Sequence, residues 1–82
     1  MSSKYIILRT TEGEKAVIFP GDDFYHDDVA RHFDGSEVVS AGFVVIDAGG
    51  AIKCFGKSTG LGIASRGVDD EIVIRHQLRE PK

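Results

Sequence analysis

Four short runs of β-branched and aromatic residues constrain the fold most, because each of them ends at a segment rich in turn-forming residues. The runs lie at residues 5–8, 16–19, 37–47 and 52–57. Runs of this kind, joined in pairs by short Gly-containing segments, are typical of antiparallel hairpins. Gly42 inside the third run predicts a bulge or a close approach of another backbone segment. The sequence therefore predicts two hairpins.

The turn of the second hairpin predicts its register. Gly49-Gly50 supplies the positive φ angles that a tight two-residue turn requires. Such a turn pairs Val45 with Cys54 and Val44 with Phe55. Cys54 is then a strand residue that is at least half buried, which favours core packing over a role as a nucleophile.

Two other segments predict helices. The first has an apolar stripe that recurs every four residues: Tyr25, Val29 and Phe33. It predicts a helix from about 23 to 33, capped by Asp22 or Asp23 and ended near Gly35. The second segment, 69–79, has an acidic start and later arginines, which favour a helix, although its β-branched residues also suit a strand.

Together these elements predict an α+β fold in the order β-β-α-β-β-α. We expect a mainly antiparallel four-stranded sheet with two helices packed on one face. A chain of 82 residues suits one small domain, residues 1–82, with one modest core. That size leaves little room for an enclosed active site, so it favours a binding module, or an oligomer that completes its core across an interface.

Composition limits the expected cellular compartment and the classes of partner. A net charge of −3 argues against nucleic acid, because DNA-binding domains usually carry a basic patch. One cysteine, Cys54, cannot form an internal disulfide, and the N-terminal apolar run is too short for a signal peptide. No run approaches the roughly 20 apolar residues that span a bilayer. We therefore expect a cytoplasmic protein with no membrane partner.

Charge is distributed unevenly along the chain. Residues 20–37 contain six acidic residues against Arg31, whereas residues 53–68 contain three cations and no acid. The acidic surface is predicted at four residues: Asp22, Asp23, Asp27 and Asp28. The two segments attract each other within a monomer or between protomers, or they are two solvated surfaces of opposite sign.

The cationic segment contains the best candidate for a binding loop, residues 56–67. It has four glycines, three hydroxyl residues and two cations. Glycines let backbone N–H groups approach a ligand, and successive N–H groups bind anions. The candidate residues, for an anion or a protein partner, are Lys57, Ser58, Thr59, Gly60, Gly62, Ser65 and Arg66. The alternative is a long connection whose glycines allow tight packing over the sheet.

No motif for catalysis or metal binding is complete in this sequence. A P-loop requires a glycine where this chain has Ala51, and Gly60 and Gly62 would break the helix that should follow. Asp28 and His32 share a helix face at a spacing open to metal binding, but no second ligand pair accompanies them. We therefore predict no catalytic residues, no metal and no cofactor.

Three segments carry a resemblance: 39–44 (VSAGFV), 54–58 (CFGKS) and 61–66 (LGIASR). They resemble small uncharacterised proteins of bacteria and their prophages, over roughly the C-terminal half. The resemblance implies a phage or prophage accessory protein that binds and blocks or modulates a host protein. We therefore expect non-enzymatic protein binding, with a homodimer as the expected assembly. The alternative function is a small-molecule anion or nucleotide binder that uses loop 56–67.

Overall fold

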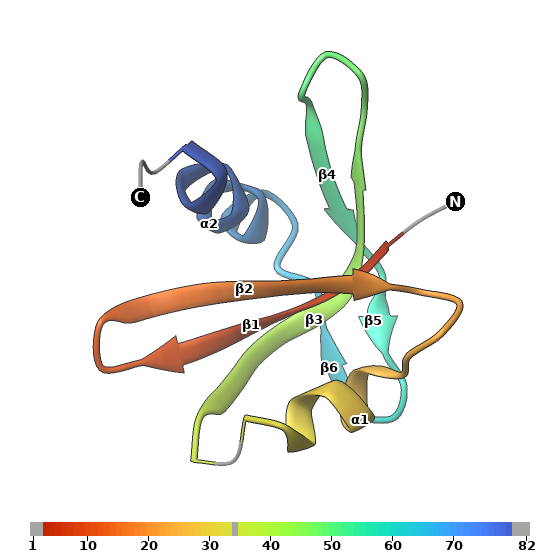
Figure 1. Cartoon of the computed structure of the whole chain (residues 1–82), viewed down its shortest axis with the longest axis vertical. Helices are drawn as coiled ribbons and strands as arrows, with labels where there is room; N and C mark the ends of the chain where they lie inside the picture. The colour runs from red at the N-terminus through yellow and green to blue at the C-terminus, as the bar shows by residue number, and fades with distance from the viewer. Residues whose placement is uncertain (1–2, 34, 80–82) are drawn as a thin grey trace.

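The computed structural model describes residues 3–33 and 35–79, and a four-stranded antiparallel sheet forms its centre (Figure 1). The sheet order β2-β1-β3-β4 joins β1 (Ser3–Thr10), β2 (Gly13–Pro20), β3 (Glu37–Ile46) and β4 (Ile52–Phe55). The remaining elements are α1 (His26–Arg31), β5 (Lys57–Ser58), β6 (Ile63–Ala64) and α2 (Val68–Arg79). The predicted α+β class, sheet and two helices are confirmed, and the β5–β6 hairpin is added.

The two helices pack on opposite faces of the sheet, which corrects the expectation that they share one face. Successive residues of β1 point to opposite faces. Tyr5 and Ile7 pack with Ile74 of α2, whereas Ile6 packs with Val29 of α1. Residues 5–8 are all buried, because this central strand is apolar without alternation and needs a cover on both faces.

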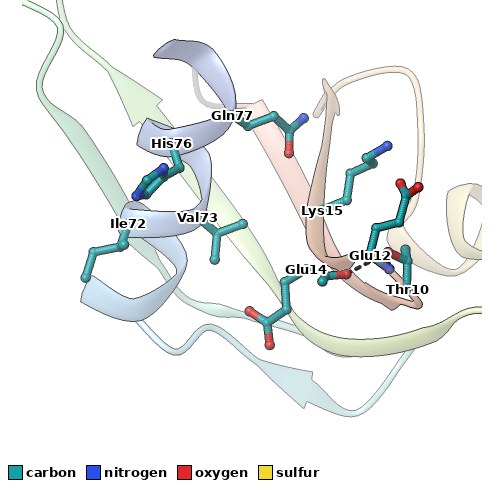
Figure 2. Close-up of a pocket in the computed structure, with 9 residues that line it drawn as sticks. Thr10, Glu12, Glu14, Lys15, Ile72, Val73, His76 and Gln77 are labelled. Carbon is teal, nitrogen blue, oxygen red and sulfur yellow. Dashed lines mark hydrogen bonds between the residues drawn. The ribbon is translucent and has the colours of Figure 1, made fainter. Parts of the chain in front are cut away.

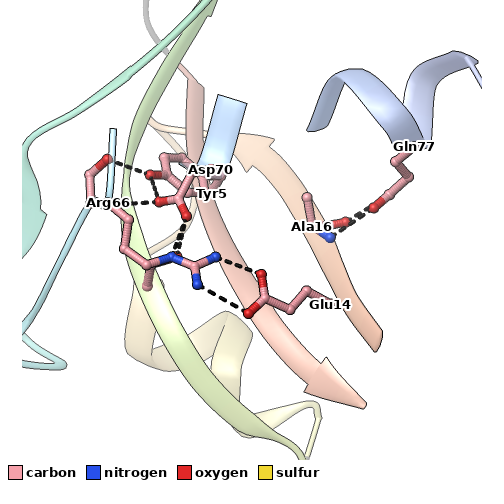
Figure 3. Close-up of polar contacts among 8 residues, drawn as sticks. Tyr5, Glu14, Ala16, Arg66, Asp70 and Gln77 are labelled. Atoms are coloured by element: carbon pink, nitrogen blue, oxygen red, sulfur yellow. Dashed lines mark hydrogen bonds and ion pairs between the residues drawn. The ribbon is translucent and has the colours of Figure 1, made fainter. Parts of the chain in front are cut away.

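Helix α2 contacts both edges of the sheet, and its side chains pair with the edge backbones. The Gln77 amide accepts a hydrogen bond from Ala16 N at 2.8 Å and donates to Ala16 O at 2.9 Å, on the outer edge of β2 (Figure 3). At the other edge, the Glu71 carboxylate accepts a hydrogen bond of 3.0 Å from Cys54 N in β4. Helix α2 thus satisfies edge backbone groups of one residue in β2 and one in β4.

The register of the β3–β4 hairpin differs by one residue from the prediction. Val44 pairs with Cys54 and Val45 with Lys53. Residues 47–51 separate the strands, and Asp47 N donates to Ala51 O at 3.0 Å, so the turn is formed by 48–50, one residue more than predicted. The Asp47 carboxylate accepts hydrogen bonds of 2.9 Å from both Gly49 N and Ala51 N. The Asp47 side chain, rather than the glycines alone, therefore sets the turn.

Gly42 confirms the predicted close approach. A Cβ atom at this position would lie 2.5 Å from Phe55 O and 3.1 Å from Ser65 Cβ, so another residue would clash. The register shift of β3 lies before Gly42, where Ser40 pairs with Ile7 and Val38 with Leu8. Gly42 thus permits the segment after β4 to cross β3.

Helix α1 begins at His26, later than predicted, and neither Asp22 nor Asp23 caps it. Its N-cap is Tyr25, which makes no side-chain cap hydrogen bond. Contacts from distant strands fix the segment instead: Lys4 Nζ donates to Phe24 O at 3.1 Å, and His26 Nε2 lies 2.8 Å from Gly42 O. Of the predicted apolar stripe only Val29 is buried, since Tyr25 and Phe33 are exposed. The predicted stop at Gly35 adopts a positive φ of 91°.

Candidate functional site

The candidate loop 56–67 divides into two parts with different surroundings. In the first part, Leu61 packs against the core cluster that contains Val29 of α1. In the second part, Ser65 and Arg66 reach Tyr5 and Asp70 on the α2 side of the sheet. The predicted binding residues therefore form two groups, one with Lys57, Ser58, Thr59, Gly60 and Gly62 and the other with Ser65 and Arg66.

Ser58 and Gly62 of the first group build the turn of the β5–β6 hairpin. The buried Ser58 hydroxyl accepts a hydrogen bond of 3.2 Å from Leu61 N. Gly62 N donates to Ser58 O at 2.9 Å, and Gly62 has a positive φ of 67°, which favours glycine. These two residues are explained by local structure, which leaves Lys57, Thr59 and Gly60 as surface residues of this part.

Arg66 joins distant segments in a polar network that we call the Arg66 cluster: Tyr5, Glu14, Ser40, Ser65, Arg66 and Asp70. Its guanidinium donates to the two carboxylate oxygens of Glu14 at 3.0 and 2.7 Å, and to Asp70 at 2.7 Å (Figure 3). The Glu14 hydrogen bond raises the pKa of Arg66, and the same contact lowers the pKa of Glu14. One cation thus faces two carboxylates.

Asp70 is the buried centre of the Arg66 cluster. Its carboxylate accepts hydrogen bonds from the Tyr5 hydroxyl, from Ser40 Oγ at 2.8 Å, and from Arg66 N at 2.9 Å. Burial by itself raises the pKa of Asp70, but the hydrogen bonds donated by Tyr5, Arg66 and Ser40 outweigh burial and hold this pKa below its usual value. Burial and the neighbouring Asp70 raise the pKa of Tyr5.

The pairing of Arg66 bears directly on the anion hypothesis. A guanidinium that already binds two carboxylates carries no net attraction for a third anion. Ser65 is also engaged, because its hydroxyl lies 2.6 Å from the Tyr5 oxygen and accepts a hydrogen bond of 2.9 Å from Gly67 N. The second part of the candidate loop is therefore a structural connector between the sheet and α2.

Cys54 lies on the same side of the sheet, buried and packed with Tyr5 and Ile74. Burial raises the pKa of its thiol to about 11. Because the thiolate is the reactive form, the raised pKa and the burial of Cys54 suit a core residue better than a nucleophile.

A second site lies beside α1, where the first part of the candidate loop meets the acidic segment. This hollow of about 400 Å³, which we call the α1 hollow, is lined by Lys4, Tyr25, His26, Asp27, Asp28, Phe43, Lys57, Ser58, Thr59 and Gly60. A Cβ atom at Gly60 would lie 3.3 Å from Asp27 Cγ, so the loop closes against α1 at this point. The two oppositely charged segments thus meet within one chain.

The charges in the α1 hollow are partly paired. Asp28 forms an ion pair with Arg31 one turn along α1. Lys4 donates to Phe24 O, and its Nζ lies 5.0 Å from the centre of the Tyr25 ring. No ion pair of Asp27 or Lys57 occurs within the described part of the chain. An unpaired carboxylate and an unpaired ammonium therefore line the same hollow.

The acidic-aromatic segment, residues 22–25, lies next to the α1 hollow. Asp22 and Asp23 are exposed in the turn after β2. Phe24 and Tyr25 follow, with 49% and 69% of their surfaces exposed. Two large aromatic side chains are thus exposed to solvent between the aspartate pairs 22–23 and 27–28.

A groove of about 550 Å³ separates the β1–β2 turn from α2 (Figure 2). Glu12, Glu14 and Lys15 line one wall, and helix α2 lines the other with Ile72, Val73, His76 and Gln77. Glu14 is paired with Arg66. The Gln77 amide is paired with Ala16, whereas Glu12, Lys15 and His76 form no ion pair within the described residues.

Comparisons with known proteins add no relative: no family model, no curated protein and no solved structure matches this chain. Within residues 3–33 and 35–79, neither helix has the length and apolar character needed to cross a membrane. Over the same residues, no group of three or more His, Cys, Asp or Glu is placed to hold a metal ion.

Sequence reasoning missed most of the Arg66 cluster. Ser40 carried a signal, because a polar residue inside an apolar strand needs a buried partner. A second signal was the spacing of Arg66 and Asp70, which lie four residues apart at the start of a predicted helix. Glu14 carried none, since it lies 52 residues from Arg66 in the chain.

Proposed function

We propose that this protein is non-enzymatic and acts by binding a positively charged surface of another protein. The observation that carries the proposal is the exposure of Phe24 and Tyr25 between two pairs of aspartates. Tyrosine is enriched among the residues that dominate binding energy at interfaces. The surrounding carboxylates attract basic surfaces and repel acidic ones.

The acidic-aromatic segment is held in place before any partner arrives, which supports the proposal. Lys4 in β1 donates to Phe24 O at 3.1 Å and lies 5.0 Å from the centre of the Tyr25 ring. The next residue, His26, is anchored to Gly42 O in β3. A preorganised segment loses less conformational entropy on binding than a free loop.

The biological setting that we propose is supported by the resemblance of the C-terminal half to small uncharacterised proteins of bacteria and their prophages. We place this protein among accessory proteins that bind a host protein in the cytoplasm, with a homodimer as the expected assembly. The alternative, an anion or nucleotide site in loop 56–67, has less support. Arg66 is paired with Glu14 and Asp70, and the carboxylate of Asp27 lines the hollow that contains Lys57.

Affinity capture from a host lysate tests the proposal, followed by measurement of the affinity for the captured protein. Phe24→Ser/Tyr25→Ser is expected to weaken binding by about 30-fold or more, because truncating a dominant interface residue costs about 2 kcal/mol or more. The matched control is Val45→Ser/Ile46→Ser on the β3–β4 hairpin, whose side chains are similarly exposed.

Binding that falls only in the control variant, or equally in both, contradicts the proposed surface. The partner should also bind less tightly as salt rises, since charged contacts are screened. Sedimentation velocity on the same samples tests the homodimer, and a monomer at the highest concentration contradicts it.

A further inference from the structure

The α1 hollow presents three polar groups of different character that have no partner within the described residues. They are the carboxylate of Asp27, the ammonium of Lys57 and the Nδ1 atom of His26. The other charges nearby are engaged, Asp28 with Arg31 and Lys4 with Phe24 O.

His26 is held in one orientation. Its Nε2 lies 2.8 Å from Gly42 O, and since a carbonyl only accepts, Nε2 carries the hydrogen. The neutral ring then has its lone pair on Nδ1. The ring packs edge-on against Phe19 and Phe43, with centroids 5.6 and 5.8 Å away.

His26 lines the hollow, and its Nδ1 atom retains some accessible surface. The residue is 6% exposed, so very little of its surface reaches solvent. Every fully buried polar side-chain atom in the described part of the chain has a hydrogen-bond partner. Nδ1 has none there, so it is not fully buried, and the accessible part of His26 lines the hollow. We infer that Nδ1, held by a mostly buried and oriented ring, is the acceptor that His26 offers to the hollow.

Asp27 and Lys57 place opposite charges around this acceptor without neutralising each other. Both line the hollow, yet they do not form an ion pair. The position of the loop is fixed, because Gly60 packs against Asp27 and a Cβ atom there would lie 3.3 Å from Asp27 Cγ. A simple anion would be repelled by Asp27 and a simple cation by Lys57.

We propose that the α1 hollow binds a small zwitterion of the α-amino-acid class. The ammonium group of the ligand donates to Asp27 and to His26 Nδ1, and its carboxylate accepts from Lys57. The Phe43 ring, which lines the hollow, contacts the apolar part of the ligand. A volume of about 400 Å³ is sufficient, since small-molecule pockets start at roughly 300 Å³.

Titration of uniformly ¹⁵N-labelled protein with three related probes tests the proposal. L-phenylalanine carries both charges, its methyl ester only the ammonium, and N-acetylphenylalanine only the carboxylate. We expect saturable shifts of the amides of residues 26–28 and 57–60 with phenylalanine, and about tenfold weaker binding of each singly charged probe. The ring nitrogens of His26 should shift with phenylalanine as well.

Two charge-removing variants and their controls complete the test. Asp27→Asn and Lys57→Gln should each weaken phenylalanine binding by about tenfold, whereas Asp69→Asn and Lys53→Gln, at exposed positions elsewhere, should not. The His26 ring shifts provide the evidence for Nδ1 without a substitution in the core. The proposal is overturned by the absence of saturable shifts, by equal affinity for the three probes, or by wild-type affinity in Asp27→Asn and Lys57→Gln.

Discussion

The two parts of the glycine-rich loop contain similar residues but use their charges differently. Arg66 at one end pairs with Glu14 and the buried Asp70, and it fastens the start of α2 to the sheet. Lys57 at the other end faces the α1 hollow with Asp27, and the two do not pair. Composition alone therefore does not separate a cation that is paired within the fold from one that is not. The availability of a partner carboxylate within hydrogen-bond distance does.

Among the variants that test this comparison, removal of the Asp70 side chain should have the largest effect on the free energy of unfolding. Asp70→Ala leaves the Tyr5 and Ser40 hydroxyls and the Arg66 guanidinium without their shared acceptor. Breaking a buried ion pair costs about 3–5 kcal/mol, so we expect a loss of that size in the free energy of unfolding, measured with urea. Asp27→Ala should change it by less than about 0.5 kcal/mol, because Asp27 is exposed.

Asp69→Ala is the neighbouring control, since Asp69 is exposed in the same helical turn. It should cost less than about 1 kcal/mol through the helix dipole. If Asp70→Ala is too unstable to purify, Asp70→Asn keeps the shape and removes the charge. Equal effects of the Asp69 and Asp70 variants would show that the Arg66 cluster does not fasten α2.

Local patterns were sufficient for part of this architecture. The two hairpins and the helix over 69–79 follow from short apolar runs, turn residues and an acidic helix start, and all three are confirmed. The start of α1 was wrong because contacts from Lys4 and Gly42, distant in the chain, fix that segment. The β3–β4 register was wrong by one residue because the Asp47 side chain accepts two backbone hydrogen bonds.

The candidate site was predicted as a set of residues but not as a geometry. The acidic segment and Lys57 were both identified, and their meeting in one hollow follows from the crossing at Gly42. The aromatic exposure was not anticipated, since the spacing of Tyr25 and Val29 predicted a buried stripe. A period of four residues shows which side chains share a helix face, but not whether the fold covers that face.

Acid should weaken the Arg66 cluster in a defined direction. The folded-state pKa values of Asp70 and Glu14 are lowered, so the unfolded chain binds protons more readily than the folded protein. The resulting stability is complete above the unfolded pKa of about 4 and is lost as pH falls through the lower folded values. We expect unfolding free energy, measured with urea at a series of pH values, to decrease below about pH 4.

The pH experiment separates the two parts of the loop. Glu14→Gln should reduce the steepness of the acid decrease, because it removes one carboxylate whose protonation is linked to folding. Asp27→Asn should leave the decrease unchanged, since the Asp27 carboxylate forms no ion pair with any described residue. A decrease in unfolding free energy at low pH that depends on Asp27 and not on Glu14 would contradict this comparison. It would mean that Asp27, and not Glu14, is the carboxylate linked to folding.

The smallest expected effect is that of a simple anion on thermal stability. Inorganic phosphate should cause no saturable rise in Tm beyond that of chloride at equal ionic strength, because Arg66 is paired and Asp27 stands beside Lys57. A ligand at one hundred times its Kd stabilises by about 2.7 kcal/mol, which a thermal shift detects readily. A phosphate-dependent rise that Lys57→Gln abolishes would make the first part of the loop an anion site. A rise that persists in Lys57→Gln and disappears in Arg66→Gln would instead show that the ion pairs of Arg66 open to admit a ligand.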